Sequence, residues 1–227
     1  MIIKRRNDSI RKNENGGEDQ MKVLIINGSP HKDGTTKTAL RELGRTLNEC
    51  GVETEILEVG GAGVSGCVGC GACHRGYDGC ANDPFVRAAA EKFKVADGLV
   101  VASPVYYASP NGTLIAFLDK LFYSTLFDKT MKVGAAVVCA RRGGCTASFD
   151  VLNKYFTISG MPIASSTYWN QVHGAIAEDA PEDAEGMATM RTLGKNMAFL
   201  IKSISLGKEK FGLPEKEPQT RTNFIKR

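Results

Sequence analysis

The sequence predicts an α/β protein in which a five-stranded parallel sheet is covered by helices on both faces. Short apolar runs alternate along the chain with longer segments of helical periodicity, which is the order expected for such a sheet. Several of the apolar runs lack polar alternation, as is typical of strands buried on both faces. The 227 residues are enough for one substantial domain, and 42% hydrophobic with 24% charged residues is an ordinary globular composition.

The first predicted βαβ unit begins near the N-terminus. KVLIIN, at 22–27, is an apolar run that leads into Gly-Ser-Pro, so we expect a buried strand followed by a loop. Residues 36–50 place apolar or small side chains at helical spacing, and Gly51 follows as a C-cap. Residues 52–59 alternate and then become apolar, which suits a second strand. A loop rich in Gly and Cys then covers residues 60–82.

The middle of the chain is predicted to form a helix, a strand and a second helix. Residues 84–96 read as a helix that Asp83 caps, with Pro84 at its first position. Residues 98–102 are a fully apolar strand, and residues 112–126 form a helix with one apolar side.

The remaining predicted elements complete the alternation. Residues 131–139 (MKVGAAVVC) are another buried strand, and residues 146–158 read as a helix. The fifth strand is expected at 162–168, followed by a long amphipathic helix at 183–206.

The two ends of the chain differ in charge from the rest. Residues 1–20 carry a net charge of +1 and residues 208–227 carry +3, whereas residues 21–207 are neutral. We expect the domain at 21–207 and a solvated tail at 208–227. Because Met21 begins the first strand region, we expect residues 1–20 to be a disordered extension or a misassigned start. A neutral domain with weakly basic ends is a poor nucleic-acid binder.

The sequence contains no feature that indicates a membrane protein or a secreted one. No apolar run reaches the roughly 18 residues that a membrane span requires. The first twenty residues lack the continuous apolar stretch of a signal peptide. We therefore expect a cytoplasmic protein that binds no membrane.

The loops that follow the first, third and fourth predicted strands are chemically unusual. Ligands of open α/β sheets bind at the carboxyl ends of strands, at the switch point of the strand order. The first loop runs from Gly28 to Thr38 into a helix, where free N–H groups and the helix dipole favour an anion. Ser29, Thr35 and Thr36 add hydroxyl groups, so the loop suits a single phosphate. The alternative is a capped helix whose Ser and Thr bond only their own backbone.

The second and third loops suit a planar ring. The second, residues 103–112, contains Tyr106 and Tyr107, adjacent aromatic side chains that offer a flat wall. The third, residues 141–144, combines two Arg with two Gly, so the backbone can approach a ligand closely and Arg can offset negative charge. The alternatives are a packed turn in the second loop and a glycine turn with solvated arginines in the third.

Four of the seven cysteines fall within fourteen residues. They are Cys67, Cys70, Cys73 and Cys80, in the spacing C-x2-C-x2-C-x6-C. Because disulfides are disfavoured in a chain without an export signal, the cluster points to metal, iron–sulfur or redox thiol chemistry. Zinc can use the same four thiolates, and free thiols or a redox pair remain alternatives.

Three segments, IINGSPHKDGTTKTAL, SPVYYASPNGTLIAFLDK and RRGG, in combination resemble the flavodoxin-like NAD(P)H-dependent FMN reductase family. The resemblance covers roughly residues 21–206 and implies a flavodoxin-like fold with bound FMN. It implies an FMN phosphate on Ser29, Thr35 and Thr36, with His31 nearby. Members often carry Arg where this chain has His31, which is mostly neutral at pH 7. The implied contacts of the isoalloxazine ring are Pro104, Val105, Tyr106, Tyr107, Arg142, Gly143 and Gly144.

The cysteine loop resembles the compact motif of iron–sulfur flavoproteins within this fold family. Three cysteines at a two-residue spacing can wrap three corners of a [4Fe–4S] cube, and the fourth closes it. The implied ligands are Cys67, Cys70, Cys73 and Cys80. The resemblance also implies that the cluster accepts single electrons from FMN across a subunit boundary, in a homodimer or homotetramer.

These features predict an FMN-dependent NAD(P)H oxidoreductase that passes electrons to a small-molecule or protein acceptor. NAD(P)H as co-substrate reduces FMN and the acceptor reoxidises it, so we predict no catalytic side chain. One alternative is a flavodoxin- or ferredoxin-like electron carrier without a substrate of its own, although such carriers tend to be acidic. Another is a redox- or metal-sensing protein whose input is the cysteine loop.

Overall fold

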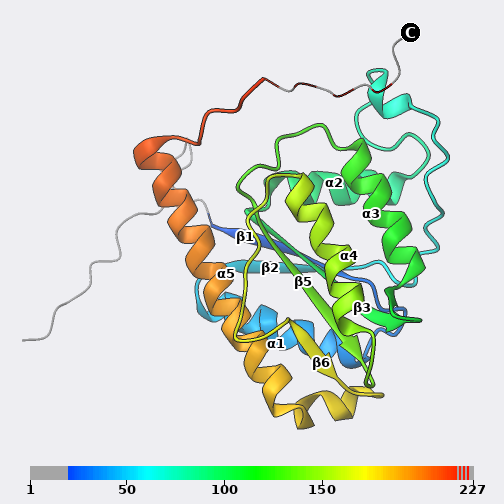
Figure 1. Cartoon of the computed structure of the whole chain (residues 1–227), viewed down its shortest axis with the longest axis vertical. Helices are drawn as coiled ribbons and strands as arrows, with labels where there is room; N and C mark the ends of the chain where they lie inside the picture. The colour runs from blue at the N-terminus through cyan, green and yellow to red at the C-terminus, as the bar shows by residue number, and fades with distance from the viewer. Residues whose placement is uncertain (1–19, 219, 221, 223, 225–227) are drawn as a thin grey trace, which may run out of the picture.

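The central feature of the protein is a parallel sheet between two layers of helices (Figure 1). The computed structural model describes residues 20–218, 220, 222 and 224, so the extension predicted at 1–20 lies, apart from Gln20, outside the described residues. The strands of the sheet are β1 (Lys22–Asn27), β2 (Glu53–Glu58), β3 (Gly98–Tyr106), β5 (Val133–Ala140) and β6 (Gln171–His173). Their spatial order is β2-β1-β3-β5-β6, with all neighbours parallel. This is the flavodoxin-like order, and it confirms the predicted fold class.

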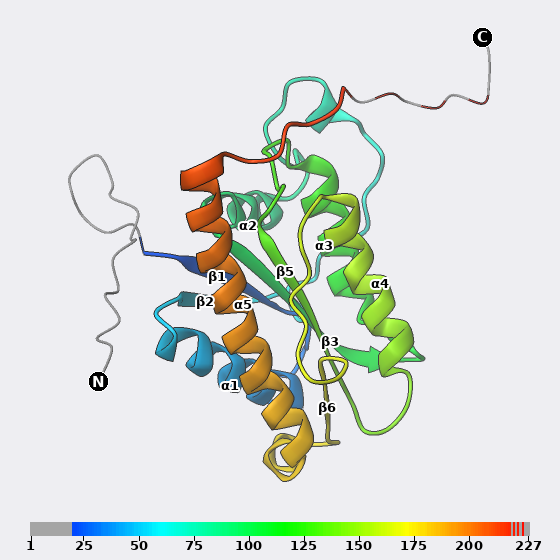
Figure 2. The ribbon, with the colours of Figure 1, turned by 60° about the vertical axis from the view of Figure 1, so that its left-hand side comes forward.

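The helices cover both faces of the sheet (Figures 1 and 2). One face is covered by α1 (Thr35–Glu49) and α5 (Ala184–Phe211), which lie side by side. The other face is covered by α2 (Pro84–Val95), α3 (Gly112–Ser124) and α4 (Cys145–Ile158). Of the helices within the described residues, none combines the length and apolarity that crossing a membrane requires.

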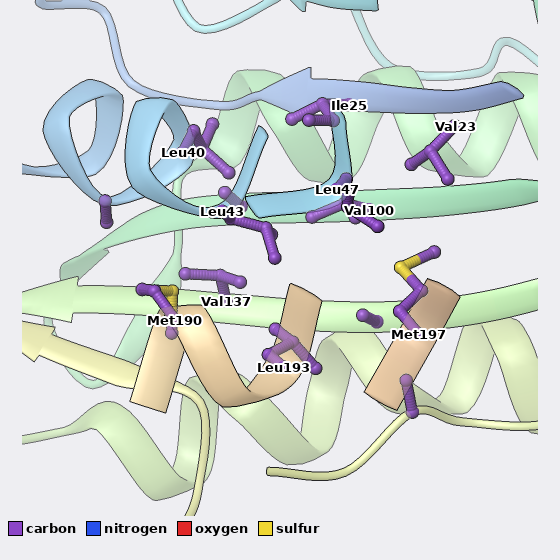
Figure 3. Packing of buried hydrophobic residues seen from close by; sticks show 14 of the residues in the cluster. Val23, Ile25, Leu40, Leu43, Leu47, Val100, Val137, Met190, Leu193 and Met197 are labelled. Atoms are coloured by element: carbon purple, nitrogen blue, oxygen red, sulfur yellow. The ribbon is translucent and has the colours of Figure 1, made fainter. Parts of the chain in front are cut away.

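The strands read as continuous apolar runs because both of their faces are buried. In β1, Val23 and Ile25 belong to the core beneath α1 and α5, whereas Leu24 and Ile26 belong to the core on the opposite face. Figure 3 shows the first of these cores, in which Leu193 of α5 packs with residues of α1 and the strands. Each such side chain contributes about 1.5–3 kcal/mol relative to its exposed state, so the two cores hold the three layers together.

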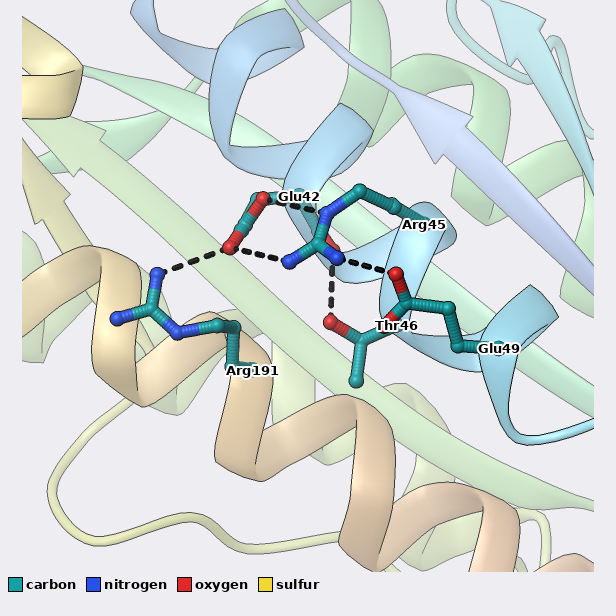
Figure 4. Close-up of polar contacts among 5 residues, drawn as sticks. All are labelled: Glu42, Arg45, Thr46, Glu49 and Arg191. Carbon is teal, nitrogen blue, oxygen red and sulfur yellow. Dashed lines mark hydrogen bonds and ion pairs between the residues drawn. The ribbon is translucent and has the colours of Figure 1, made fainter.

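A network of charged side chains ties α1 to α5 (Figure 4). Glu42 accepts hydrogen bonds from Arg45 at 2.9 Å and from Arg191 of α5 at 2.9 Å. Arg45 also pairs with Glu49, and the Thr46 hydroxyl donates to the Glu42 carbonyl oxygen at 3.0 Å. The hydrogen bond from Arg45, aided by that from Arg191, lowers the pKa of the Glu42 carboxyl, while burial opposes the shift.

The predicted helices are all present, and four of the five predicted strands are confirmed, with ends that differ by a few residues. The largest difference among the helices is at α5, which continues to Phe211 instead of ending near residue 206. The first four residues of the expected tail at 208–227 are therefore helical.

The strand predicted at 162–168 is wrong. That segment meets β5 through one isolated bridge, Ile163 opposite Gly134, and the fifth strand of the sheet is β6. The chain returns to β5 at Asn170, whose buried amide donates to the Ala136 carbonyl at 3.0 Å and whose carbonyl accepts from Val138 N–H at 3.0 Å. Residues 162–168 therefore lie beside β5 with this single bridge, and the paired strand begins after Asn170.

Candidate functional site

The loops after β1, β3 and β5 meet at one edge of the sheet, because these strands are parallel neighbours. Gly28, the first residue after β1, donates its N–H to the Ala102 carbonyl of β3 at 2.8 Å. A Cβ at Gly28 would lie 2.6 Å from Leu114 of α3, so the loop passes where only glycine fits. On the other side, a Cβ at Gly144 would lie 2.8 Å from the Cα of Ala108. The structure therefore brings the three predicted loops together.

The first loop ends at a helix start that no side chain caps. Gly34 is the N-cap of α1, so the first N–H groups of α1 receive no side-chain acceptor. Asn27 Oδ1 accepts from the Ser29 N–H at 3.1 Å, and Ser29 Oγ accepts from the His31 N–H at 3.2 Å. The Ser29 hydroxyl proton is donated to no described residue, so it remains available to an anion.

Thr35 and Thr36 are buried, and their hydroxyls already have partners. Thr35 Oγ1 donates to the Ile176 carbonyl at 2.8 Å. The Thr36 hydroxyl bonds the thiol of Cys139, whose pKa is raised to about 12 by burial even though this bond opposes the rise. Both threonines lie in the first turn of α1, where an anion would meet their backbone N–H groups rather than their hydroxyls.

The second loop is a tight hairpin. β3 continues to Tyr106, beyond its predicted end at residue 102, and pairs with β4 (Ser109–Pro110). The two connecting residues, Tyr107 and Ala108, have φ angles of 49° and 58°. Asn and Gly usually supply this conformation, which costs other residues roughly 1–2 kcal/mol each. Strained turns of this kind concentrate at functional sites, and Tyr107 projects fully exposed from this one.

The base of the hairpin is fixed to α3. The buried Ser103 hydroxyl donates to the Pro104 carbonyl at 2.8 Å and accepts from the Asn111 N–H at 2.8 Å. The Asn111 side chain in turn caps α3 by accepting from the Thr113 N–H at 2.7 Å. The tyrosine turn therefore stands on a rigid support.

The third loop places two exposed arginines beside a second uncapped helix start. Arg141 and Arg142 are exposed, and Gly144, with φ of 89°, is the N-cap of α4 without a side-chain cap. The N-termini of α1 and α4 thus flank one edge of the sheet, and both favour an anionic ligand.

The four clustered cysteines line one pocket of about 160 Å³. Cys73 is buried, Cys80 is half-buried, and Cys67 and Cys70 are exposed; all four are free thiols. Across the part of the chain that the structure describes, no three His, Cys, Asp or Glu side chains are grouped so that they could hold a metal ion. Lys120, Tyr123 and Ser124 of α3 form the opposite wall.

Although the side chains that the structure describes are not grouped as metal ligands, the four thiols that line the pocket are chemically suited to a metal–sulfur group. Four thiols are the usual ligand set of a [4Fe–4S] cluster. Gly69 and Gly71 adopt φ angles of 64° and 68°, which lets the chain turn sharply between successive cysteines. Ser124 Oγ is buried at the pocket wall and has no hydrogen-bond partner among the described residues. A hydroxyl in this position is suited to a sulfur acceptor in the pocket.

Two arginines hold the backbone of the cysteine loop. Arg75 donates to the Cys70 carbonyl at 2.8 Å, and Arg87 donates to the Cys80 carbonyl at 2.6 Å. The Arg87 guanidinium also lies over the Tyr77 ring, 5.7 Å from its centroid. These contacts place positive charge around a loop that would carry negative thiolates.

Comparison with known proteins identifies the family. A family model described as NADPH-dependent FMN reductase matches residues 21–175. The chain belongs to this family. An iron–sulfur flavoprotein of Methanocaldococcus jannaschii is 30% identical over 192 residues, which cover 81% of this chain and 99% of that protein. An iron–sulfur flavoprotein of Methanosarcina thermophila is also 30% identical, covering 84% of this chain and all of that protein.

Among solved structures, a flavodoxin from the domain Archaea matches with a TM-score of 0.52 at 16% identity, covering 80% of this chain and 99% of that chain. This likeness agrees with the strand order. This FMN reductase family member is therefore a flavodoxin-like, flavin-dependent oxidoreductase of the iron–sulfur flavoprotein branch.

The sequence did not predict that two polar residues of α3, Lys120 and Ser124, line the cysteine pocket. Lys120 and Ser124 follow Phe117 by three and seven positions, so they lie on its buried stripe. A Lys and a Ser on the apolar side of a predicted helix indicate a polar site there, because buried polar groups require partners. Asn111 also had a recognisable N-cap signature, directly before the apolar helix.

Proposed function

We propose that this protein is an FMN-dependent NAD(P)H oxidoreductase that passes electrons to a small-molecule or protein acceptor through a [4Fe–4S] cluster. The observation that carries the proposal is the meeting of the three loops and two uncapped helix starts at one edge of the sheet. This edge is where flavodoxin-like sheets bind a mononucleotide. Membership of the FMN reductase family supports the same ligand.

The first loop would hold the FMN phosphate. The Ser29 hydroxyl and the backbone N–H groups of Thr35 and Thr36 would donate to its oxygens, with His31 at the exposed rim. The hydroxyl and backbone donors are neutral, so the helix dipole supplies most of the attraction.

The hairpin and the third loop would hold the isoalloxazine ring. The proposed contacts are Pro104, Val105, Tyr106, Tyr107, Arg142, Gly143 and Gly144. Bound FMN would supply the hydride and electron chemistry between NAD(P)H and an acceptor. The residues around it need only bind and orient the ring, and the positive charge of Arg142 would offset negative charge on its reduced form. No side chain is required to exchange a proton.

The pocket lined by Cys67, Cys70, Cys73 and Cys80 would hold the [4Fe–4S] cluster. The support is the set of four free thiols in one pocket and the similarity, over nearly their whole length, to proteins named iron–sulfur flavoproteins. When bound, such a cluster accepts single electrons. A zinc ion bound by the same thiolates would have no redox role, so the metal decides whether this pocket carries electrons.

The two proposed cofactor sites lie at opposite ends of α3. The hairpin joins the first turn of α3, whereas the cysteine pocket is lined by its last turns, and the helix of 13 residues is about 20 Å long. This separation within one chain favours electron transfer between two copies of the chain, so we propose a homodimer or homotetramer. Light scattering on the eluting protein measures its mass and tests this.

The test of the proposed function is anaerobic purification followed by absorption spectroscopy, iron and sulfide analysis, and steady-state oxidation of NADH and NADPH. We expect bound FMN, about four irons per chain and sustained turnover. Bound FMN without turnover would identify an electron carrier instead. Flavin reduction that survives loss of the metal would favour a redox or metal sensor. A colourless protein that does not bind FMN at micromolar concentrations would overturn the proposal.

A further inference from the structure

We propose that Lys120 and Ser124 of α3 donate hydrogen bonds to the sulfur atoms of the cluster held by the four cysteines and raise its reduction potential. This inference rests on the proposed function and extends it. It assigns a role to the wall of the pocket that carries no cysteine.

Ser124 is the first observation. Its side chain is 2% exposed, it lines the cysteine pocket, and its hydroxyl has no hydrogen-bond partner among the described residues. A helical Ser or Thr can donate to the carbonyl four residues earlier, and the next residue, Thr125, does so to Leu121 at 2.8 Å. Ser124 makes no such bond. Because an unsatisfied buried hydroxyl is unfavourable, an acceptor within the pocket accounts for it.

Lys120 is the second observation, one helical turn before Ser124 on the same face of α3. It is 5% exposed and also lines the pocket. Its ammonium donates to Asp83 Oδ2 at 2.9 Å and to Ser65 Oγ at 3.2 Å. An ammonium has three N–H donors, and the third has no acceptor among the described residues. A cation this deeply buried is costly to desolvate, which argues for a function beyond packing.

A third donor already bonds a cysteine sulfur. Asn82 also lines the pocket, and its Nδ2 donates to Cys70 Sγ at 3.5 Å. Hydrogen bonds to sulfur and nearby positive charge stabilise the more negative, reduced form of an iron–sulfur cluster. Lys120, Ser124 and Asn82 would therefore all raise the reduction potential of the cluster.

A substitution at Asp83 tests whether fixed charge near the pocket sets the reduction potential of the cluster. Its carboxylate faces Lys120, and its other oxygen caps α2 by accepting from the Val86 N–H at 3.2 Å. Asn is as good an N-cap as Asp, so Asp83→Asn removes the negative charge while keeping the cap. If fixed charge sets the potential, Lys120→Met and Asp83→Asn must shift it in opposite directions.

The experiment is an anaerobic titration of the holoprotein with dithionite, in which electron paramagnetic resonance follows the reduced cluster. For Lys120→Met we expect at least a tenfold fall in the equilibrium constant of one-electron reduction, equivalent to ~59 mV. Ser124→Ala should lower the potential by a smaller amount, and Asp83→Asn should raise it. Thr125→Val is the matched control, because it removes a neighbouring hydroxyl that is already bonded within the helix, and its potential should equal that of the wild type.

Each other outcome has a defined meaning. If Lys120→Met fails to fold or to assemble the cluster, Ser124→Ala and Asp83→Asn still decide the proposal. A normal iron and sulfide content with unchanged potentials in these variants would overturn this inference and leave the proposed function intact. Shifts of Lys120→Met and Asp83→Asn in the same direction would also overturn it. Absence of iron and sulfide from the wild type would remove the proposed cluster itself.

Discussion

Gly144 of the third loop lies against the hairpin so closely that only glycine fits at this position. Its φ is 89°, and a Cβ at this position would lie 2.8 Å from atoms of both Ala108 and Val105. Gly143, its neighbour, has nothing within 4 Å of an added Cβ and no left-handed φ. The two glycines therefore form a natural comparison.

We expect Gly144→Ala to lower the free energy of unfolding by about 1–3 kcal/mol, because it introduces both backbone strain and a clash. It should also weaken FMN binding, since the two loops that would hold the ring must separate. Urea unfolding and titration with FMN measure these effects. Gly143→Ala should leave the free energy of unfolding unchanged, because its Cβ meets no atom within 4 Å and its φ is not left-handed. An equal loss of stability in both variants would contradict the close packing of Gly144 against the hairpin.

Ser29 is the predicted phosphate ligand whose hydroxyl proton is still available. A hydrogen bond to a charged group contributes about 1.5–3 kcal/mol, so Ser29→Ala should weaken FMN binding by roughly tenfold or more. Quenching of flavin fluorescence measures the affinity. Thr38→Val is the control, because the Thr38 hydroxyl donates to the Gly34 carbonyl within its own helix. A loss of equal size in the control would show that the first loop does not bind phosphate through Ser29.

The pairing of α1 with α5 depends on side chains as well as on the core beneath them. Glu42 bridges the two helices by accepting from Arg45 and Arg191, which lowers its pKa (Figure 4). A carboxyl whose folded pKa is lowered adds stability above its unfolded pKa of about 4.3, and this contribution is lost as the pH falls through the folded value.

We therefore expect a double-mutant cycle of Glu42→Gln and Arg191→Gln to give a coupling of about 0.2–1 kcal/mol at pH 7 and low salt. The coupling should shrink below about pH 4 and at high salt, because the carboxylate is protonated or screened. Urea unfolding of the four proteins at two pH values measures it. A coupling that persists unchanged at pH 3 would contradict an ionic origin.

The hairpin and the last strand show where prediction from sequence stops at the level of single elements. Apolar periodicity located every helix and four strands, because burial leaves a periodic trace in the chain. It misplaced the fifth strand, since residues 162–168 are apolar only at their start and meet β5 through one isolated bridge. It also missed the hairpin after β3, because Tyr107-Ala108 lacks the Asn or Gly that marks such turns.

Across the whole molecule, α3 separates the sheet edge from the cysteine pocket. The two proposed cofactors would therefore bind to different parts of one domain, and loss of one should leave the other in place. Cys73→Ser is the direct test, since Cys73 is the buried member of the four cysteines.

We expect Cys73→Ser to lose most of its iron while retaining FMN at the wild-type ratio and a cooperative unfolding transition. Iron analysis, flavin absorbance and far-ultraviolet circular dichroism measure these quantities. Cys50→Ser, at a half-buried cysteine outside the pocket, should keep both cofactors. Joint loss of iron and FMN in the Cys73 variant would mean that the two sites depend on each other.

The chain's own order of residues was enough to identify the layered sheet, the three unusual loops and the four-cysteine motif, because each is encoded by local pattern and spacing. Contacts between distant segments decided the rest. The closeness of Gly144 to Ala108, and the place of Lys120 and Ser124 in the cysteine pocket, arise from segments that meet only when the sheet and helices pack. No local pattern records whether a buried hydroxyl finds a partner, since that partner lies in another part of the folded chain.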